Sequence, residues 1–232
     1  MHFGGIQKNS FIDYPGKVSC VVFLSGCNFD CPYCHNPSLV RGGSECTASL
    51  NYNGLYDFLK SRRTFLDGVV ISGGEPTLHE DLGKLCEAVK ELGYPIKLDT
   101  NGSRPRELKR LIRHGLVDYI AMDIKTDPSH YQPFVRDDYN PEDILTSIVT
   151  IMELAPDYEF RTTCVKRFVD ERVIEKIAKL IKNAKLYALQ KFNKSELLHP
   201  EFFRDSESWH SEEDLINLKR IAEPWVRECM VR

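Results

Sequence analysis

Residues 68–92 read GVVISGGEPTLHEDLGKLCEAVKEL, and this stretch shows the unit from which the fold is built. The apolar, β-branched run Gly68–Ile71 predicts a buried strand, and the polar residues Ser72–Pro76 predict a turn after it. Apolar residues at helical spacing over Leu82–Leu92 predict a helix, and Gly93 stands where a helix C-terminus favours a residue with positive φ. The stretch therefore predicts one strand–turn–helix unit of an α/β protein.

The same alternation of short apolar runs and longer amphipathic runs recurs along the chain. The predicted strands are Val18–Leu24, Gly68–Ile71, Ile96–Asp99, Tyr119–Ile124, Glu159–Cys164 and Lys185–Gln190. The predicted helices lie near Leu50–Arg62, Leu82–Leu92, Arg106–His114, Ile144–Leu154, Arg172–Ile181 and Asp214–Arg227. Successive strand–helix units give a parallel sheet with right-handed crossovers. Because a complete TIM barrel has eight such units, we expect a partial (βα)6 barrel, with a doubly wound sheet as the alternative.

No Pro/Gly/Ser-rich linker divides the chain, so we expect a single domain over residues 1–232. Its core should span about 17–191, preceded by an extension at 1–16 in which Asp13–Gly16 predicts a plain turn. A helical tail is expected over 192–232. Within it, Lys194–Glu213 mixes aromatic and charged residues, which suits either a partner-facing loop or a strap across the open edge of the barrel.

Charge and hydropathy exclude several classes of partner. The net charge is −3, so there is no basic excess of the kind that binds nucleic acid. The first residues lack the basic-then-apolar layout of a secretory signal, and Val18–Leu24 is too short an apolar run to cross a bilayer. We therefore expect a cytoplasmic protein without membrane contacts, in which thiols stay reduced and serve metals or catalysis.

Three cysteines, Cys27, Cys31 and Cys34, form a C-x3-C-x2-C run that can hold a [4Fe–4S] cluster by three corners. The fourth iron would then be open to bind a small molecule, whereas electron carriers bind all four irons. Two alternatives remain: a structural zinc site that adds His35, and an electron-transfer or binding module without further chemistry. The other cysteines are scattered and are interpreted as buried or incidental residues: Cys20, Cys46, Cys86, Cys164 and Cys229.

Unusual polar residues lie at or near the carboxyl ends of the predicted strands. They are Ser72–Pro76, Asp99–Gly102, Asp123–Lys125, Arg161 and Gln190, and Cys27 follows the first strand. Barrel and open-sheet enzymes build their active sites at this edge. We therefore expect these residues to converge on one site.

The side-chain types at this edge suit an amino-acid moiety. Carboxylates at Glu75, Asp99 and Asp123 could accept hydrogen bonds from an ammonium group. Lys125 and Arg161 could hold a carboxylate, the arginine in a bidentate way. The pair Gly73 and Gly74 would allow backbone to approach a ligand closely. Beside an open iron, such an amino-acid group could chelate the metal.

With these motifs the chain resembles the radical S-adenosylmethionine (SAM) superfamily. The resemblance rests on the cysteine run, with Tyr33 before its last cysteine, and on the Gly-Gly-Glu-Pro run after the second strand. Cys34-His35-Asn36, Asp99-Thr100-Asn101-Gly102 and Asp123-Ile124-Lys125 resemble the glycyl-radical-enzyme activases. The runs Lys8–Gly16 and Cys34–Pro37 are similar to anaerobic ribonucleoside-triphosphate reductase activating proteins.

The resemblance implies a role for each matching residue. Cys27, Cys31 and Cys34 would ligate the cluster and, with Lys125 and Arg161, form the catalytic set. The backbone of Tyr33 would contact the adenine, and Gly73, Gly74 and Glu75 would line the site of the methionine amino group. On the ribose side, Gln190 replaces a sixth-strand histidine. The other cofactor-binding residues would be Asp99, Asn101, Asp123, Lys125 and Arg161. Asp99, Thr100, Asp123 and the carbonyl of Ala121 resemble a monovalent-cation site beside the SAM carboxylate.

The implied reaction is reductive cleavage of SAM by an electron from a flavodoxin or ferredoxin. The resulting 5′-deoxyadenosyl radical would abstract hydrogen from a glycine of a partner, which the subgroup motifs indicate is anaerobic ribonucleotide reductase. The alternative within the superfamily is a small-molecule enzyme resembling the 7-carboxy-7-deazaguanine synthases. Residues 192–232 contain one cysteine, Cys229, so no auxiliary cluster is expected there.

Overall fold

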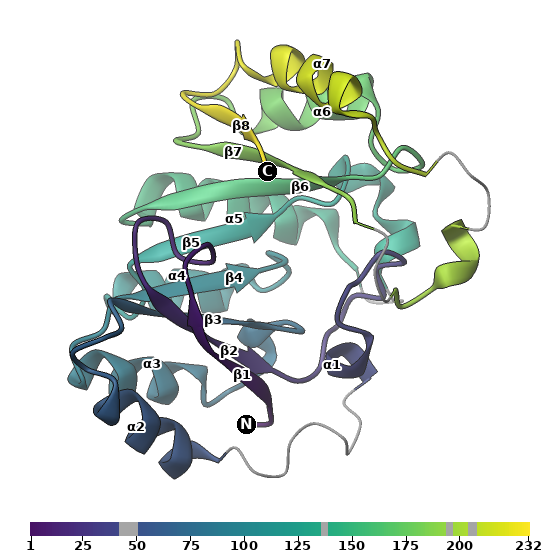
Figure 1. The fold of residues 1–232 in the computed structure, drawn as a ribbon. Coiled ribbons are helices and arrows are strands. Elements are labelled where there is room, and N and C mark those ends of the chain that lie inside the picture. The colour runs from purple at the N-terminus through teal and green to yellow at the C-terminus, as the bar shows by residue number, and fades with distance from the viewer. Residues whose placement is uncertain (42–50, 136–138, 194–196, 204–207) are drawn as a thin grey trace.

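A computed structural model describes residues 1–41, 51–135, 139–193, 197–203 and 208–232 (Figure 1). The strands are β1 Phe3–Ser10, β2 Ser19–Leu24, β3 Gly68–Gly73, β4 Ile96–Thr100, β5 Tyr119–Asp123, β6 Tyr158–Cys164, β7 Tyr187–Lys191 and β8 Cys229–Val231. The α-helices are α1 Pro37–Arg41, α2 Tyr52–Ser61, α3 Leu82–Glu91, α4 Pro105–Arg113, α5 Pro141–Leu154, α6 Glu171–Leu180 and α7 Glu212–Ala222. Short 3₁₀ helices are η1 Pro76–Leu78, η2 Pro128–His130, η3 Gln132–Phe134 and η4 Pro200–Phe203.

The strands form one sheet in the order β1-β2-β3-β4-β5-β6-β7-β8, the same order as in the chain. Strands β2 to β8 pair in parallel, and β1 pairs antiparallel with β2. The expected partial barrel is confirmed, and each predicted strand overlaps a strand of the sheet. The doubly wound alternative is wrong, because such a sheet reverses its strand order at a switch point.

The two edge strands differ from the sequence prediction. Residues 1–16 contain β1, a full strand beside β2, where an extension was expected. The last helix, expected to reach Arg227, ends at Ala222, and β8 then adds to β7. Both segments were missed because their burial depends on a sheet edge that only the folded chain provides. Leu50, the expected start of the second helix, lies outside the described residues.

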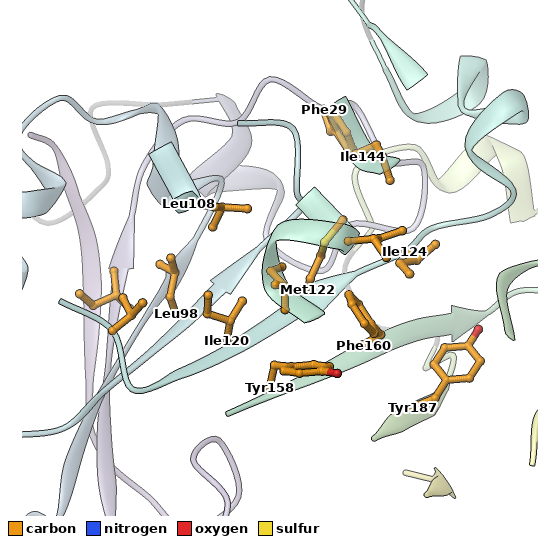
Figure 2. Close-up of a cluster of buried hydrophobic side chains, with 14 of the residues drawn as sticks. Phe29, Leu98, Leu108, Ile120, Met122, Ile124, Ile144, Tyr158, Phe160 and Tyr187 are labelled. Carbon is orange, nitrogen blue, oxygen red and sulfur yellow. The ribbon is translucent and has the colours of Figure 1, made fainter. Parts of the chain in front are cut away.

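The main hydrophobic core lies between the parallel strands and the helices that cover their outer face. Figure 2 shows part of it, including Leu98, Ile120 and Phe160 from the strands and Leu108 from α4. These side chains are fully buried. Alternation along each strand directs one set of residues to this core and the other set to the inner face of the sheet. The core thereby fixes which side chains line the inside of the barrel.

The inner face carries a smaller apolar cluster and, beside it, buried charge. Tyr14, from the turn after β1, packs against Tyr119 of β5 with ring centroids 6.0 Å apart. Glu159 of β6 is 1% exposed, and its Oε2 lies 2.8 Å from Nη2 of Arg232. Tyr119 donates its hydroxyl to the same carboxylate. These groups fill the inner face nearer the amino ends of the strands, so the opposite edge is left for a site.

In Figure 1 the arrowheads of β3, β4 and β5 point to the side on which α1 lies. The segment around residue 200 reaches the same side. No helix of the described residues is long and apolar enough to span a membrane.

Candidate active site

The cysteine-bearing loop, residues 25–36, follows β2 and is fixed to the loop after β3. The backbone N–H of Gly74 donates to the carbonyl of Leu24, and that of Glu75 donates to the carbonyl of Gly26, each at 2.8 Å. Gly73 has a φ of +125°, and a Cβ at Gly74 would lie 2.0 Å from the Gly26 oxygen. The glycine pair therefore lets two backbones approach each other. Both glycines also line the site cavity, and their close approach to a ligand stays a prediction.

The other side of the cysteine loop is held by the segment 197–203. The N–H of Leu198 donates to the Cys34 carbonyl, and the N–H of His199 donates to the Pro32 carbonyl. The His199 ring also lies 3.1 Å from the carboxylate of Asp30. This part of Lys194–Glu213 is thus a strap across the cysteine loop, while 194–196 and 204–207 lie outside the described residues.

Cys27, Cys31 and Cys34 all line one cavity at the carboxyl edge of the sheet, as the sequence predicted. Burial raises the pKa of the Cys27 thiol to about 11 and that of Cys31 to about 12. Because cluster ligands are thiolates, cluster binding must expel these protons. The backbone N–H of Phe29 donates to the Cys27 sulfur at 3.4 Å, a contact suited to a metal-bound thiolate.

These features fit an iron–sulfur cluster held by three cysteines. His35 lines the same cavity, but its ring stacks on Phe192 with centroids 6.0 Å apart. The scattered cysteines Cys20, Cys86, Cys164 and Cys229 are buried elsewhere, which agrees with their interpretation as buried residues, and Cys46 lies outside the described residues. No fourth cysteine of the described chain lines the cavity.

The charged residues expected at the strand ends form a continuous row of ion pairs, called here the charge ladder. It runs Lys97–Asp99–Arg161–Asp123–Lys125, from β4 across β5 and β6 to the loop after β5. Asp123 lies directly opposite Arg161 in the β5–β6 register, which explains the 2.7 Å contact between its Oδ1 and the Arg161 Nε. Except for Lys97, the ladder residues line the cysteine cavity.

The ladder shifts the pKa of each of its carboxylates. Burial alone raises the pKa of Asp99, but Arg161 and Lys97 outweigh it and hold that pKa below its ordinary value. Burial likewise opposes ionisation of Asp123, and Arg161 and Lys125 lower its pKa well below the usual range. Asp123 in turn raises the pKa of Lys125 against the effect of burial. Asp99, Asp123 and Lys125 are therefore charged at neutral pH.

Glu75 is placed differently from the sequence prediction. Its side chain is fully buried and is not part of the cavity wall. Oε1 accepts hydrogen bonds from the backbone and hydroxyl of Thr77 and from the Thr100 hydroxyl, and Oε2 accepts from the N–H of Asn101 at 2.6 Å. Its carboxylate thus joins the loops after β3 and β4, while the expected partner was a ligand ammonium group.

The remaining candidates contribute in different ways. Asn101 lines the cavity and donates its side-chain amide to Asn28, within 4.0 Å of the Cys27 sulfur. Tyr33 lines it too, and its buried hydroxyl has no hydrogen-bond partner among the described residues. Gln190 lines it from β7. A backbone position for a ligand at Tyr33, as the resemblance implies, stays a prediction.

Lys97 was not predicted as part of this charged site, whereas Ser72 was expected at the strand edge without an assigned partner. Lys97 is 2% exposed and binds Asp99, and Ser72 donates its hydroxyl to the Asp99 Oδ2 at 3.0 Å. A signal for Lys97 was present: a lysine two residues before Asp99 in a strand must share its face.

Two of the residues expected to bind a monovalent cation have other surroundings in the structure. The Thr100 hydroxyl donates a hydrogen bond to Glu75, and Ala121 lies buried within β5.

Comparison with known proteins agrees with this geometry. The profile of the Radical SAM superfamily matches residues 21–181. A Methanocaldococcus jannaschii protein named "Putative glycyl-radical enzyme activating enzyme" is 38% identical over 98% of this chain and 94% of its own length. A pyruvate formate-lyase-activating enzyme of Clostridium pasteurianum is 35% identical over 52% of this chain and 50% of its own.

Solved structures support the fold alone. Streptococcus suis SuiB superposes with a TM-score of 0.67 at 14% identity, over 91% of this chain and 48% of its own. Methylornithine synthase superposes with a TM-score of 0.65 at 18% identity, over 90% of this chain and 63% of its own. The family follows from the matched profile and the full-length relative, and the three cysteines that line one cavity agree with it. The chain belongs to the radical SAM superfamily and, within it, to the family of glycyl-radical-enzyme activating enzymes.

Proposed function

We propose that this protein cleaves SAM reductively and generates a glycyl radical on anaerobic ribonucleoside-triphosphate reductase. The convergence of the three cysteines and the charge ladder on one cavity supports the chemistry, in a chain whose full-length relative carries an activating-enzyme name. The runs Lys8–Gly16 and Cys34–Pro37 support the choice of partner, because they are similar to reductase activating proteins.

The residues of the chain have separable tasks in this proposal. Cys27, Cys31 and Cys34 hold the [4Fe–4S] cluster, which supplies the electron for SAM cleavage. Lys125 and Arg161 orient the SAM carboxylate through charge-assisted hydrogen bonds. Tyr33 and Gln190 line the space for the nucleoside. The strap holds the cysteine loop in place through backbone hydrogen bonds to Cys34 and Pro32.

The test combines the reduced, cluster-loaded protein with SAM and the reductase under anaerobic conditions. We expect a glycyl radical signal by electron paramagnetic resonance on the reductase and stoichiometric 5′-deoxyadenosine. Cys31→Ala is the matched control, and it should lose the cluster absorption, SAM cleavage and radical formation together. Cleavage without a glycyl radical would reject the proposed partner and indicate a small-molecule substrate. No cleavage by an intact cluster would reject the radical chemistry and favour an electron carrier.

We further propose that the electron donor is an acidic flavodoxin or ferredoxin that docks on α4. Residues 104–113 carry five basic side chains and one acidic one, in a chain of net charge −3. Arg106, Lys109 and Arg113 recur at helical spacing, are exposed and form no ion pair with any residue that the structure describes. The helix begins just beyond Ser103, whose hydroxyl accepts a hydrogen bond from the side-chain amide of Asn28, next to Cys27.

An acidic carrier on this face would therefore sit close to the cluster loop, and charge would speed its docking. Reversing the charge in Arg106→Glu/Lys109→Glu should lower the reduction rate by flavodoxin about tenfold at low salt. Reduction by dithionite should not change. Lys60→Glu/Arg62→Glu, at the end of α2, makes the same change of net charge and is the control. An equal loss with both reductants, or no loss with flavodoxin, would reject this docking face.

A further inference from the structure

We infer that the ammonium group of Lys97 takes the place of the monovalent cation implied for the activase site, so that this protein binds SAM without such an ion. This inference rests on the proposed binding of SAM in the cysteine cavity. Asp99 and Asp123 are the carboxylates that would ligate the cation. Each of them is instead bound by cationic side chains of the chain itself.

Lys97 is built into the sheet as a fixed cation. It lies in β4 two residues before Asp99, so both side chains stand on the inner face. Its Nζ is 2.5 Å from Asp99 Oδ1, and its side chain is 2% exposed. A buried lysine is retained in charged form only with such a partner, since an unpaired ammonium loses its hydration without compensation.

Every carboxylate oxygen of the two aspartates already accepts a hydrogen bond. Asp99 Oδ1 accepts from Lys97 and, at 3.4 Å, from Arg161, while Oδ2 accepts from Ser72. Asp123 Oδ1 accepts from Arg161 at 2.7 Å and Oδ2 from Lys125 at 2.9 Å. A sodium or potassium ion would have to share these oxygens with cationic donors that repel it, and a hard cation also needs several further oxygens.

The charge balance points the same way. The ladder holds three cationic and two anionic side chains, which leaves one positive charge at the cavity. Cationic side chains of the chain therefore already outnumber the two carboxylates that would ligate an added monovalent ion.

The first experiment compares salts on the wild-type protein at constant ionic strength. SAM affinity of the cluster-loaded protein is measured by calorimetry in sodium, potassium or choline chloride, and ion binding to the cluster-free protein is measured by ²³Na relaxation. We expect affinities equal within about twofold and no saturable sodium binding. A gain in affinity of about tenfold with either ion, or saturable sodium binding, would overturn the inference. Absence of SAM binding in every salt would instead reject the proposed function.

The second experiment removes the internal cation. Lys97→Met keeps the length of the side chain, and it should bind SAM at least about tenfold more weakly in choline chloride, with sodium or potassium restoring most of the loss. Lys60→Met, on the exposed side of α2, should behave as wild type. Unchanged SAM affinity in the Lys97 variant, or a loss of affinity that neither ion restores, would contradict the inference that Lys97 takes the place of the ion. If circular dichroism shows that the variant does not fold, the wild-type salt comparison decides the question.

Discussion

Glu75 illustrates how a residue in a signature motif can act on the protein itself. Its carboxylate accepts four hydrogen bonds, from Thr77, Thr100 and Asn101, and it is fully buried. Burial raises the pKa of Glu75 above its ordinary value, and these hydrogen bonds oppose that rise. The residue therefore holds the loops after β3 and β4 in register beside the cavity.

Glu75→Gln should destabilise the cluster-free protein, because the amide –NH2 of the new side chain would face a backbone or hydroxyl donor. We expect the free energy of unfolding to fall by about 2 kcal/mol, the typical cost of mispairing a buried hydrogen-bonded charge. Urea denaturation of the variant and of Glu80→Gln, an exposed control, measures this effect. An unchanged free energy of unfolding together with weakened SAM binding would indicate that the carboxylate contacts the ligand after all.

At the scale of single residues, local sequence predicted the three cysteines that line the cavity and most of the rest of its wall. The cysteine spacing needs no tertiary information, and neither does the location of Asp99 and Asp123 at strand ends or of Arg161 within its strand. The partners of these residues were not predictable, because the contact between Asp123 and Arg161 depends on strand register. Lys97 was missed because a lysine inside a strand is ordinarily a solvent-facing residue.

At the scale of elements, the glycine pair after β3 explains how the cysteine loop is positioned. Gly74→Ala should displace this loop, since the new Cβ would lie 2.0 Å from the Gly26 oxygen and 3.2 Å from the Cys27 nitrogen. We expect a loss of about 1–3 kcal/mol in stability, as for other overpacked sites, and reduced iron content after reconstitution. Gly54→Ala in α2 meets only the Asn51 side chain, at 3.5 Å, and is the control. Full iron content in the Gly74 variant would contradict this role.

Asp127 connects the loop after β5 to α6, and its contribution depends on pH. Burial alone raises the pKa of Asp127, but hydrogen bonds from Lys176 and Ser129 outweigh it and lower that pKa to about 2. A lowered pKa stabilises the fold above the unfolded-state pKa of about 4 and stops doing so as pH falls through the folded-state pKa.

Asp127→Asn should therefore reduce the free energy of unfolding at pH 7 by roughly 1–2 kcal/mol, a value that allows for the exposure of Lys176. The difference from wild type should shrink as pH falls from about 4 to 2. Chemical denaturation at several pH values measures this trend, with Asp57→Asn on α2 as the control. A difference that stays constant over this range would exclude the ionised carboxylate as its cause.

Element prediction succeeded where the pattern was periodic and failed at the sheet edges. Each of the strands β2 to β7 contains a buried stretch that sequence pattern alone identifies. β1 contains two glycines and mostly polar residues, so its pairing with β2 left little signal. The three residues of β8 follow α7 closely, and their parallel pairing with β7 depends on the completed sheet.

At the scale of the whole molecule, the pair Glu159–Arg232 ties the last strand to the inside of the barrel. Arg232→Met should leave the buried Glu159 carboxylate with Tyr119 alone and cost about 3 kcal/mol of unfolding free energy. Adding Glu159→Gln should recover part of that loss, because the unpaired charge disappears. A thermal and chemical double-mutant cycle measures the coupling. Strictly additive effects would show that the two side chains do not stabilise each other.

The order of the strands has a consequence for synthesis of the chain. Each strand pairs with its neighbour in sequence, so the sheet can grow from β1 onward while later residues are still being added. The strap is different, because His199 meets Asp30 across a separation of 169 residues. A nascent chain would present its three cysteines on a formed loop before residues 197–203 exist to cover them. A cluster inserted before release from the ribosome would thus meet an uncovered cysteine loop. A cluster inserted after release would meet a loop that the strap already covers.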